Sequence, residues 1–248
     1  MEKIVSLSKN KESKILKQFS RFAQSYGRYN VIQTEVAKLL VERIPTKFYP
    51  TIIDLGSGDG EVYKNLIKKH ITFEKFVAWD SSEQMLALHP KGLIIDKYMA
   101  DFNYQKSYEN IENKKENTLL ISSSALQWSE DLDFVFRELS QKASRAYFAI
   151  FTSNTFKTLH EIAQIDSPIY TEKELKEVIE KYYSTDFELK KYTLAFKTVR
   201  EMFQYIKKSG VSGGEKRLSY KQSKKVMQTY PLDYLEFEVL FVEATSLA

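Results

Sequence analysis

Three of the chain's eight glycines, Gly56, Gly58 and Gly60, lie within five residues. Glycines at alternate positions indicate a turn that needs backbone conformations open mainly to glycine. The preceding residues, 51–55, form a β-branched run typical of a buried strand, and the apolar residues that follow recur at helical spacing to about Lys69. Strand, glycine turn and helix together are the opening unit of a nucleotide-binding α/β sheet.

Acidic residues decide which ligand this turn suits. Asp54 precedes the turn, Asp59 lies within it, and Glu61 stands where a dinucleotide fingerprint needs its third glycine. Carboxylates would repel a pyrophosphate, which argues against a nicotinamide enzyme, and they suit a ligand with a cationic amine. Taken alone, the motif still allows an ordinary glycine turn without a ligand. The candidate binding residues here are Asp54, Gly56, Ser57 and Gly58.

A further carboxylate ends the second predicted strand, 75–80. Asp80 follows Asp54 by 26 residues, and a carboxylate at a strand tip can accept hydrogen bonds from both hydroxyls of a ribose. Ser81 and Ser82 are candidate helix caps, and Met85 falls one helical turn later, where it could pack on an adenine ring. The second strand therefore adds Asp80, Ser81 and Met85 to the candidate site.

The rest of the chain supplies the elements that position these residues. Further strands are expected near 93–99, at 117–122, 145–151 and 233–243, with Asp131 capping a helix after the fourth strand. Asp101, which alone would be an ordinary turn residue, and Phe102 follow the third strand, and Ser122 ends the fourth. Successive strand–helix units predict an α/β, doubly wound sheet that binds its ligands at the carboxyl ends of the strands.

Two regions of the chain lie outside the strand–helix units of this sheet. Helices are expected at 14–29 and 31–44, which form an N-terminal arm. Later helical patterns at 156–165, 172–183 and 198–208, with a strand at 187–196, predict an inserted lid over the substrate, with a hinge-like turn at 209–214. A single domain of residues 1–248 follows, with an arm at 1–47, a sheet core at 48–154 and 184–248, and lid elements at 155–183 and 197–230.

The glycine loop resembles the first motif of the class I S-adenosylmethionine-dependent methyltransferases, and the whole chain resembles the malonyl-carrier-protein O-methyltransferase family of biotin synthesis. Five segments carry the latter resemblance: Phe19-x-Arg-x-Ala-x-x-Tyr26, the Asp54 glycine loop, Ser124-Ala-Leu-Gln-Trp128 with Phe136-Arg-Glu-Leu139, Phe156-x-x-Leu-His160, and Tyr230-Pro-Leu-x-Tyr234. Departures are Ser57 and Asp59, where the family carries Cys and Pro, and a lid stretch at 202–212 without the family's second glycine and nearby arginine.

The resemblance implies a Rossmann-like doubly wound seven-stranded sheet, S-adenosylmethionine as cofactor, and methyl transfer to the free carboxylate of a malonyl thioester on acyl carrier protein or coenzyme A. It also implies that Asp101 and the apolar residue after it hold the adenine. Such a carboxylate is already ionised near neutral pH, so no general base is required. The candidates for orienting it are Tyr26, Gln127, His160 and Lys207. Each of three candidates also has a purely structural explanation: Tyr26 could be a core residue, His160 could pack within the lid, and Lys207 could lie on a solvated helix face.

Composition limits the remaining classes. The chain has no cysteine, only three histidines and no apolar run near the roughly 18 residues of a membrane span. We therefore expect a cytoplasmic, metal-free monomer. The net charge of +4 is small, but residues 197–225 hold nine basic residues against two acids, which suits an acidic carrier protein better than nucleic acid. The alternatives are a methyltransferase acting on another small carboxylic acid or on tRNA, and a pseudoenzyme.

Overall fold

The structure is a computed structural model that describes residues 30–112, 115–208 and 218–247. Its strands are β1 (Phe48–Leu55), β2 (Thr72–Asp80), β3 (Ile95–Met99), β4 (Thr118–Ser123), β5 (Arg145–Phe151), β6 (Tyr183–Ala195) and β7 (Tyr234–Ser246). Its α-helices are α2 (Val31–Arg43), α3 (Glu61–Lys68), α4 (Glu83–Leu88), α5 (Lys106–Glu109), α6 (Leu132–Ser140), α7 (Lys157–Ala163), α8 (Glu172–Ile179), α9 (Val199–Lys208) and α10 (Tyr220–Thr229). Two short 3-10 helices are η1 (Lys115–Asn117) and η2 (Leu126–Trp128).

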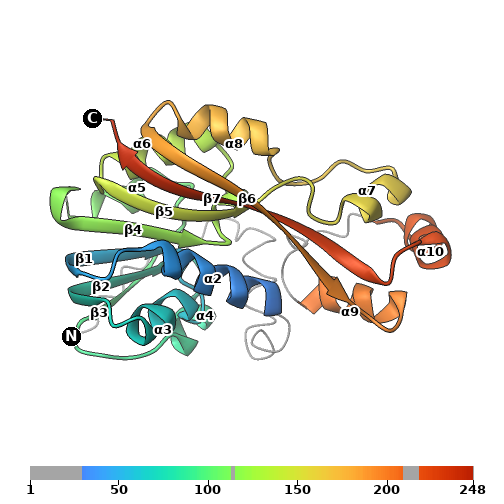
Figure 1. The fold of residues 1–248 in the computed structure, drawn as a ribbon, viewed down its shortest axis with the longest axis horizontal. Helices are drawn as coiled ribbons and strands as arrows, with labels where there is room; N and C mark the ends of the chain where they lie inside the picture. The colour runs from blue at the N-terminus through green and yellow to red at the C-terminus, as the bar shows by residue number, and fades with distance from the viewer. Residues whose placement is uncertain (1–29, 113–114, 209–217, 248) are drawn as a thin grey trace.

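The strands of the described chain form one seven-stranded sheet in the order β3-β2-β1-β4-β5-β7-β6 (Figure 1). Strands β1 to β5 pair in parallel, and β7 runs antiparallel to both of its neighbours. The chain order changes direction between β1 and β4, and in this type of sheet the ligand-binding crevice opens at that switch point. The predicted Rossmann-like seven-stranded sheet is therefore confirmed.

Alternate residues of the central strands face opposite sides of the sheet. Ile52 belongs to the apolar cluster that includes α2 and α3, whereas the next residue, Ile53, belongs to the cluster that includes α6 and α8. Both isoleucines are buried, and burial of such a side chain stabilises the fold by about 1.5–3 kcal/mol. Two covered faces explain why these strands read as continuous apolar runs in the sequence.

Polar side chains begin the predicted helices as the sequence suggested. Asp131 accepts a 3.0 Å hydrogen bond from the backbone N–H of Phe134 at the start of α6, and Ser82 accepts one of 3.3 Å from that of Met85 at the start of α4. Helix α8 ends at Ile179 rather than near residue 183, because Tyr183 already pairs in β6.

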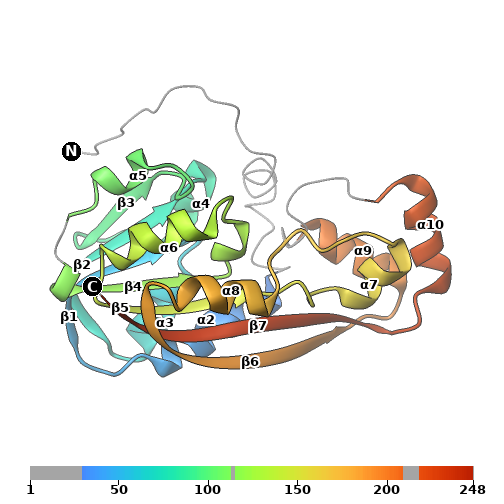
Figure 2. The same ribbon diagram turned by 90° about the horizontal axis from the view of Figure 1, so that it is seen from above.

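Strands β6 and β7 extend well past the rest of the sheet and carry a second lobe. Helices α7, α9 and α10 gather at their far end, away from β1 to β4 (Figures 1 and 2). Phe156, Met202, Val226 and Phe237 are buried there and continue the apolar cluster of α2 and α3. Helix α10 was not predicted from the sequence. Its ten residues are mostly polar, and only Val226 among them is buried in the described structure.

Helix α8 lies apart from that lobe. Its buried Leu175 and Ile179 belong to the cluster of the sheet core, and the helix packs beside α6. In the described part of the chain, none of the helices has the length and apolar character needed to cross a membrane.

Candidate functional site

The glycine turn after β1 has the backbone conformation that its composition predicted. Gly56, Gly58 and Gly60 all have positive φ, at 72°, 54° and 88°. The backbone N–H groups of Gly56 and Ser57 both donate to the carbonyl oxygen of Trp79 in β2, at 2.7 and 3.0 Å. The turn therefore folds back over the end of β2 and brings the two strand tips together.

Close contacts add a second requirement for glycine. A Cβ on Gly56 would lie 2.2 Å from the Cβ of Ala125, which follows β4, so the loops after β1 and β4 touch at the switch point. A Cβ on Gly58 would instead lie 3.4 Å from the terminal methyl carbon of Met85, an ordinary contact. Met85 itself is 2% exposed and lies beside the turn.

Asp80 closes this edge from the tip of β2. Its Oδ2 accepts from the backbone N–H of Gly58 at 2.9 Å, and its Oδ1 accepts from that of Ser82 at 2.8 Å. A carboxylate offers about four lone-pair positions, so these backbone donors do not use its full acceptor capacity. The pKa of Asp80 is raised to about 6: burial raises it most, the charge of Asp101 adds to this, and backbone hydrogen bonds from Ser82, Gly58 and Ser81 oppose it.

Asp54 is the least satisfied group at the site. It is 0% exposed, and neither of its carboxylate oxygens has a hydrogen-bond partner among the described residues. Burial, and secondarily the charge of Asp80, holds the pKa of Asp54 well above its ordinary value. A buried carboxyl without partners is unfavourable by several kcal/mol on the scale of small-molecule transfer. A ligand that brings a cationic or hydrogen-bond-donating group would relieve this penalty.

The loop after β3 is organised by Asp101. Its Oδ1 accepts from the backbone N–H and from the side-chain Nδ2 of Asn103, both at 3.0 Å, and among the described residues its Oδ2 accepts none. Phe102 is half-buried and packs against the core cluster of α6 and α8. The loop therefore presents one carboxylate oxygen, and the backbone of Asp101 also holds Ser107, whose hydroxyl donates to its carbonyl at 2.5 Å.

The end of β4 and the loop after it contribute buried polar atoms from the predicted Gln127 and from Ser123 and Ser124, which were not predicted as site residues. The hydroxyl oxygens of Ser123 and Ser124 are buried without a partner among the described residues, as is Oε1 of Gln127. Ser124 has a φ of +62°, and its carbonyl accepts a 2.6 Å hydrogen bond from Nε2 of Gln127. An uncommon left-handed serine is a backbone signal, which residue types and spacing do not reveal.

Ser122, a predicted cofactor residue, has a different surrounding. It is 1% exposed, and its hydroxyl donates at 2.8 Å to the carbonyl of Leu55, so it fastens β4 to the end of β1. Ser57 is also buried, at 6% exposed, and its hydroxyl has no partner among the described residues. Ser57 therefore fits ligand contact better than Ser122 does.

The four candidates for orienting a substrate are not all placed. Gln127 is 5% exposed in η2, at the edge beside the glycine turn. His160 lies on α7 in the second lobe, where its ring meets Phe156 edge-on at 6.5 Å between centroids. Tyr26 lies outside the described residues, and Lys207 lies in α9 with its side chain outside them.

The arrangement can bind an adenosyl group next to a cationic centre. Asp80 offers lone pairs for ligand hydroxyls, Asp54 offers a buried carboxyl without a partner among the described residues, and Met85 offers an apolar surface beside the glycine turn. The surroundings hold no serine–histidine–aspartate arrangement among the described residues, and a carboxylate nucleophile needs none.

Comparison with known proteins agrees with this geometry. No protein-family model matches the chain. A malonyl-[acyl-carrier protein] O-methyltransferase of Bacillus anthracis is 27% identical over 84% of this chain and 83% of its own length. The one of Halorhodospira halophila is 25% identical over 81% of this chain and 72% of its own length. Six further curated relatives, 22–27% identical, carry the same name.

Solved structures share the fold. The YcgJ protein of Bacillus subtilis matches with a TM-score of 0.62 at 9% identity, over 86% of this chain and 99% of that one. A phosphoethanolamine N-methyltransferase of Haemonchus contortus, bound to S-adenosylhomocysteine, matches with a TM-score of 0.56 at 14% identity, over 93% of this chain and 59% of that one. The resemblance inferred from the motifs is thus confirmed: the chain is similar over most of its length to the malonyl-[acyl-carrier protein] O-methyltransferases and has the fold of the class I methyltransferases.

Proposed function

We propose that this chain transfers a methyl group from S-adenosylmethionine to the free carboxylate of a malonyl thioester carried by acyl carrier protein, for biotin synthesis. The observation that carries the proposal is the edge formed by Asp54, the glycine turn and Asp80, in a chain that is similar to eight curated proteins of one name. The residues at this edge support S-adenosylmethionine as the cofactor, and the names of the similar proteins support a malonyl thioester as the substrate.

The described residues fit this cofactor, which supplies a methyl group on a positively charged sulfur. Asp80 would accept the two ribose hydroxyls with its remaining lone pairs, and the backbone of Gly56 and Gly58 would pass close beneath the ligand. Asp54 would act through its negative charge on the cationic end. The other proposed contacts are Ser57, Ser81, Met85, Asp101 and Phe102, with Ser122 as a support of the strand pairing.

The protein's part in the reaction is to orient and desolvate the nucleophile. The malonyl carboxylate is already ionised, so the rate depends on holding one oxygen in line with the bond that breaks and on excluding water from it. Gln127 is the described candidate at the sheet edge, since its amide is buried there. His160 would act from α7, and Tyr26 and Lys207 remain proposals from the sequence.

We propose that α7, α9 and α10 form the lid over the acyl group. They lie together on the extended ends of β6 and β7, and Nε2 of Gln222 in α10 donates at 2.9 Å to the carbonyl of Ala163 in α7 (Figure 2). Helix α8 is left out of this lid, although it falls in the range 155–183, because its apolar face packs on the sheet core.

The proposed partner is an acidic carrier protein. Five basic residues of the stretch 197–225 are exposed on the second lobe: Lys197, Arg200, Lys221, Lys224 and Lys225. Clustered positive charge steers an acidic partner and selects it over others. We further propose a monomer that acts in the cytoplasm without nucleic acid, consistent with a chain that has no cysteine and a net charge of only +4.

Comparing acyl chain lengths tests the proposal. One extra methylene displaces the reacting oxygen by roughly an ångström, and misplacement of that size can lower a rate about 100-fold. Malonyl thioesters should therefore react much faster than succinyl and glutaryl thioesters, and acetyl thioesters should not react. Equal rates for malonyl and glutaryl thioesters would favour a methyltransferase of broader acid specificity, and methylation of tRNA in their place would refute the assignment.

A further inference from the structure

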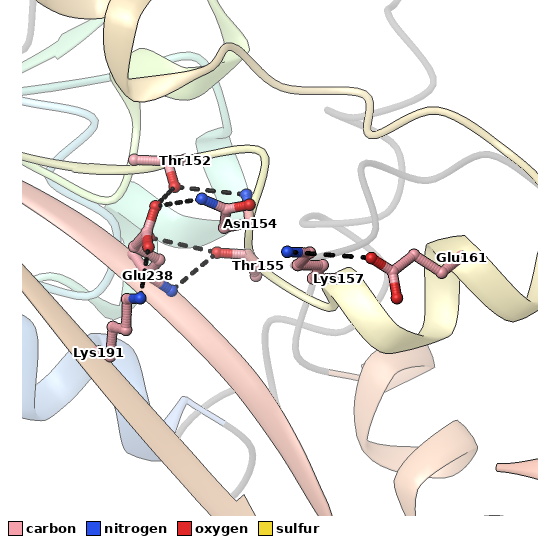
Figure 3. Close-up of polar contacts among 7 residues, drawn as sticks. All are labelled: Thr152, Asn154, Thr155, Lys157, Glu161, Lys191 and Glu238. Atoms are coloured by element: carbon pink, nitrogen blue, oxygen red, sulfur yellow. Dashed lines mark hydrogen bonds and ion pairs between the residues drawn. The ribbon is translucent and has the colours of Figure 1, made fainter. Parts of the chain in front are cut away.

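Glu238 is a buried carboxylate that lies opposite the end of β5. It is 3% exposed, and its Oε1 accepts from the hydroxyl of Thr152 at 2.6 Å and from Nδ2 of Asn154 at 2.8 Å (Figure 3). The ammonium group of Lys191, in the neighbouring strand β6, lies 3.7 Å from Oε2. The carboxylate therefore gathers the first residues that follow β5.

The backbone of Glu238 holds the same segment. Its carbonyl accepts from the backbone N–H of Thr152 at 2.9 Å, and its own N–H donates to the hydroxyl of Thr155 at 3.2 Å. Thr152 and Thr155 are 0% and 2% exposed. Main-chain and side-chain contacts thus fasten residues 152–155 across β7.

Glu236, two residues earlier in β7, does the same for the start of α7. Its carboxylate accepts from the hydroxyl and from the backbone N–H of Thr158, at 2.8 and 3.1 Å, and its carbonyl accepts from the N–H of Phe156 at 2.8 Å. Phe156, the residue before α7, makes no side-chain cap and has a left-handed φ of 59°. A carboxylate from a distant strand therefore replaces the local cap that most helices carry.

This arrangement combines buried and half-buried carboxylate contacts with a strained backbone. A buried carboxylate is favourable only when its donors are all in place, and a left-handed phenylalanine adds strain of order 1–3 kcal/mol. Strain and buried charge of this kind gather where a segment must be held in one direction. The segment held here leaves the carboxyl end of β5, on the edge where this type of sheet binds its ligands, and it leads into α7.

We propose that Glu238 and Glu236 are positioning residues for the acyl substrate: they fix the direction of the segment 152–158 and thereby hold α7, with His160, over the reacting carboxylate. This rests on the proposed function in one respect, since the acyl substrate is what α7 would cover. The cofactor residues lie on the loops after β1 to β4, so the two carboxylates should affect the acyl substrate and not cofactor binding.

Substitution of Glu238 tests the proposal. Glu238→Ala removes the acceptor for Thr152 and Asn154, so kcat/KM for the malonyl thioester should fall about 10–100-fold, whereas the Kd for S-adenosylmethionine should stay within about twofold. Glu238→Gln keeps an oxygen for both donors and should restore most of the activity. Lys157→Ala is a control on α7, because the side chain of Lys157 forms a surface ion pair with Glu161, at 3.9 Å, within the same helix. It should leave kcat/KM within about twofold.

Hydrogen–deuterium exchange gives a readout that does not depend on activity. Amides of residues 152–160 should exchange faster in Glu238→Ala than in the wild type, and Glu238→Gln should restore their protection. Unchanged exchange and unchanged kcat/KM in Glu238→Ala, or an equal loss of cofactor binding, would overturn the proposal. If Glu238→Ala does not fold, Thr152→Val removes one donor at nearly constant volume and should show the same pattern more weakly. If the wild type does not methylate malonyl thioesters, the proposed function fails. The exchange result still shows whether Glu238 holds the segment 152–158 in place.

Discussion

The backbone N–H of Gly58 donates a 2.9 Å hydrogen bond to Oδ2 of Asp80, which joins the turn after β1 to the tip of β2. The bond holds one oxygen of the carboxylate against the turn, while the other accepts from the backbone N–H of Ser82. The glycine turn and the carboxylate therefore act as one unit, and a change in either should be felt in cofactor binding.

Removal of the carboxylate is the first test of this unit. Asp80→Ala should weaken S-adenosylmethionine binding by about 2–4 kcal/mol, because two hydrogen bonds to a charged acceptor are lost. Isothermal titration calorimetry would measure the loss, and circular dichroism would check that the fold is kept. An affinity equal to that of the wild type would show that Asp80 does not hold the ribose.

The pH dependence of binding should follow the raised pKa of Asp80. Burial raises this pKa to about 6, so the carboxylate becomes protonated as the pH falls through that value and loses acceptor capacity. Cofactor affinity should therefore decrease as the pH is lowered from about 7 to about 5, by up to about tenfold per pH unit below the pKa. Calorimetry on Asp80→Asn is the control, and its weaker affinity should lack this dependence on pH.

Stability should respond to Asp80 in the opposite sense. Because the folded protein holds the proton of Asp80 more tightly than the unfolded chain does, protonation favours the folded state. Its contribution to the free energy of unfolding should be fully present below about pH 4 and lost as the pH rises through about 6. Urea unfolding of the wild type and Asp80→Asn without cofactor would isolate this contribution as the difference between the two curves. The stability of the wild type relative to Asp80→Asn should therefore fall as the pH rises from about 4 to about 7, and a relative stability that rises over this range would contradict the assigned shift.

Two glycine substitutions should differ in severity. Gly56→Ala places a Cβ 2.2 Å from the Cβ of Ala125 at a φ of +72°, so strain and a clash combine to about 2–5 kcal/mol. Gly58→Ala meets only the flexible end of Met85, at 3.4 Å, and should lower stability by about 1–2 kcal/mol. Chemical denaturation would rank them, and a greater loss for Gly58→Ala would disagree with the geometry of the turn.

Charge reversal on α10 tests the carrier-protein surface. Changing Lys221, Lys224 and Lys225 to Glu should slow methylation of the carrier-bound substrate and weaken its salt dependence, because these side chains are exposed on the second lobe. A short malonyl thioester without protein should react at a nearly unchanged rate. Lys207, Lys208 and Arg217 belong to the same basic stretch, 197–225, and we expect their reversal to Glu to have the same effect on the carrier-bound substrate.

A matched control separates local from overall charge. Reversing Lys38, Lys68 and Lys173, which are exposed on other parts of the chain, changes the net charge by the same amount. The control should retain most of the reaction with the carrier-bound substrate. Equal losses in both variants, or on both substrates, would show that the α10 lysines do not form the docking surface.

Spacing in the sequence was enough to predict the sheet and the edge that holds the candidate site. Glycines at alternate positions and acids at two strand ends depend on local geometry, so Gly56 and Asp80 could be placed without the fold. The left-handed φ of Ser124 and the unpartnered hydroxyls of Ser123 and Ser124 could not be predicted from the sequence, because they arise where two loops meet. The contact of Glu238 with Thr152 joins residues 86 apart, and only the pairing of β5 with β7 creates it.

The most direct measurement is mass spectrometry of malonyl-loaded acyl carrier protein incubated with the enzyme and S-adenosylmethionine. We expect one added methyl group on the malonyl moiety, base-labile as an ester, and none on acetyl-loaded carrier protein. Asp80→Ala should give the product only at much higher cofactor concentration. A malonyl-loaded carrier protein whose mass stays unchanged, under conditions where the enzyme binds the cofactor, would contradict the central claim.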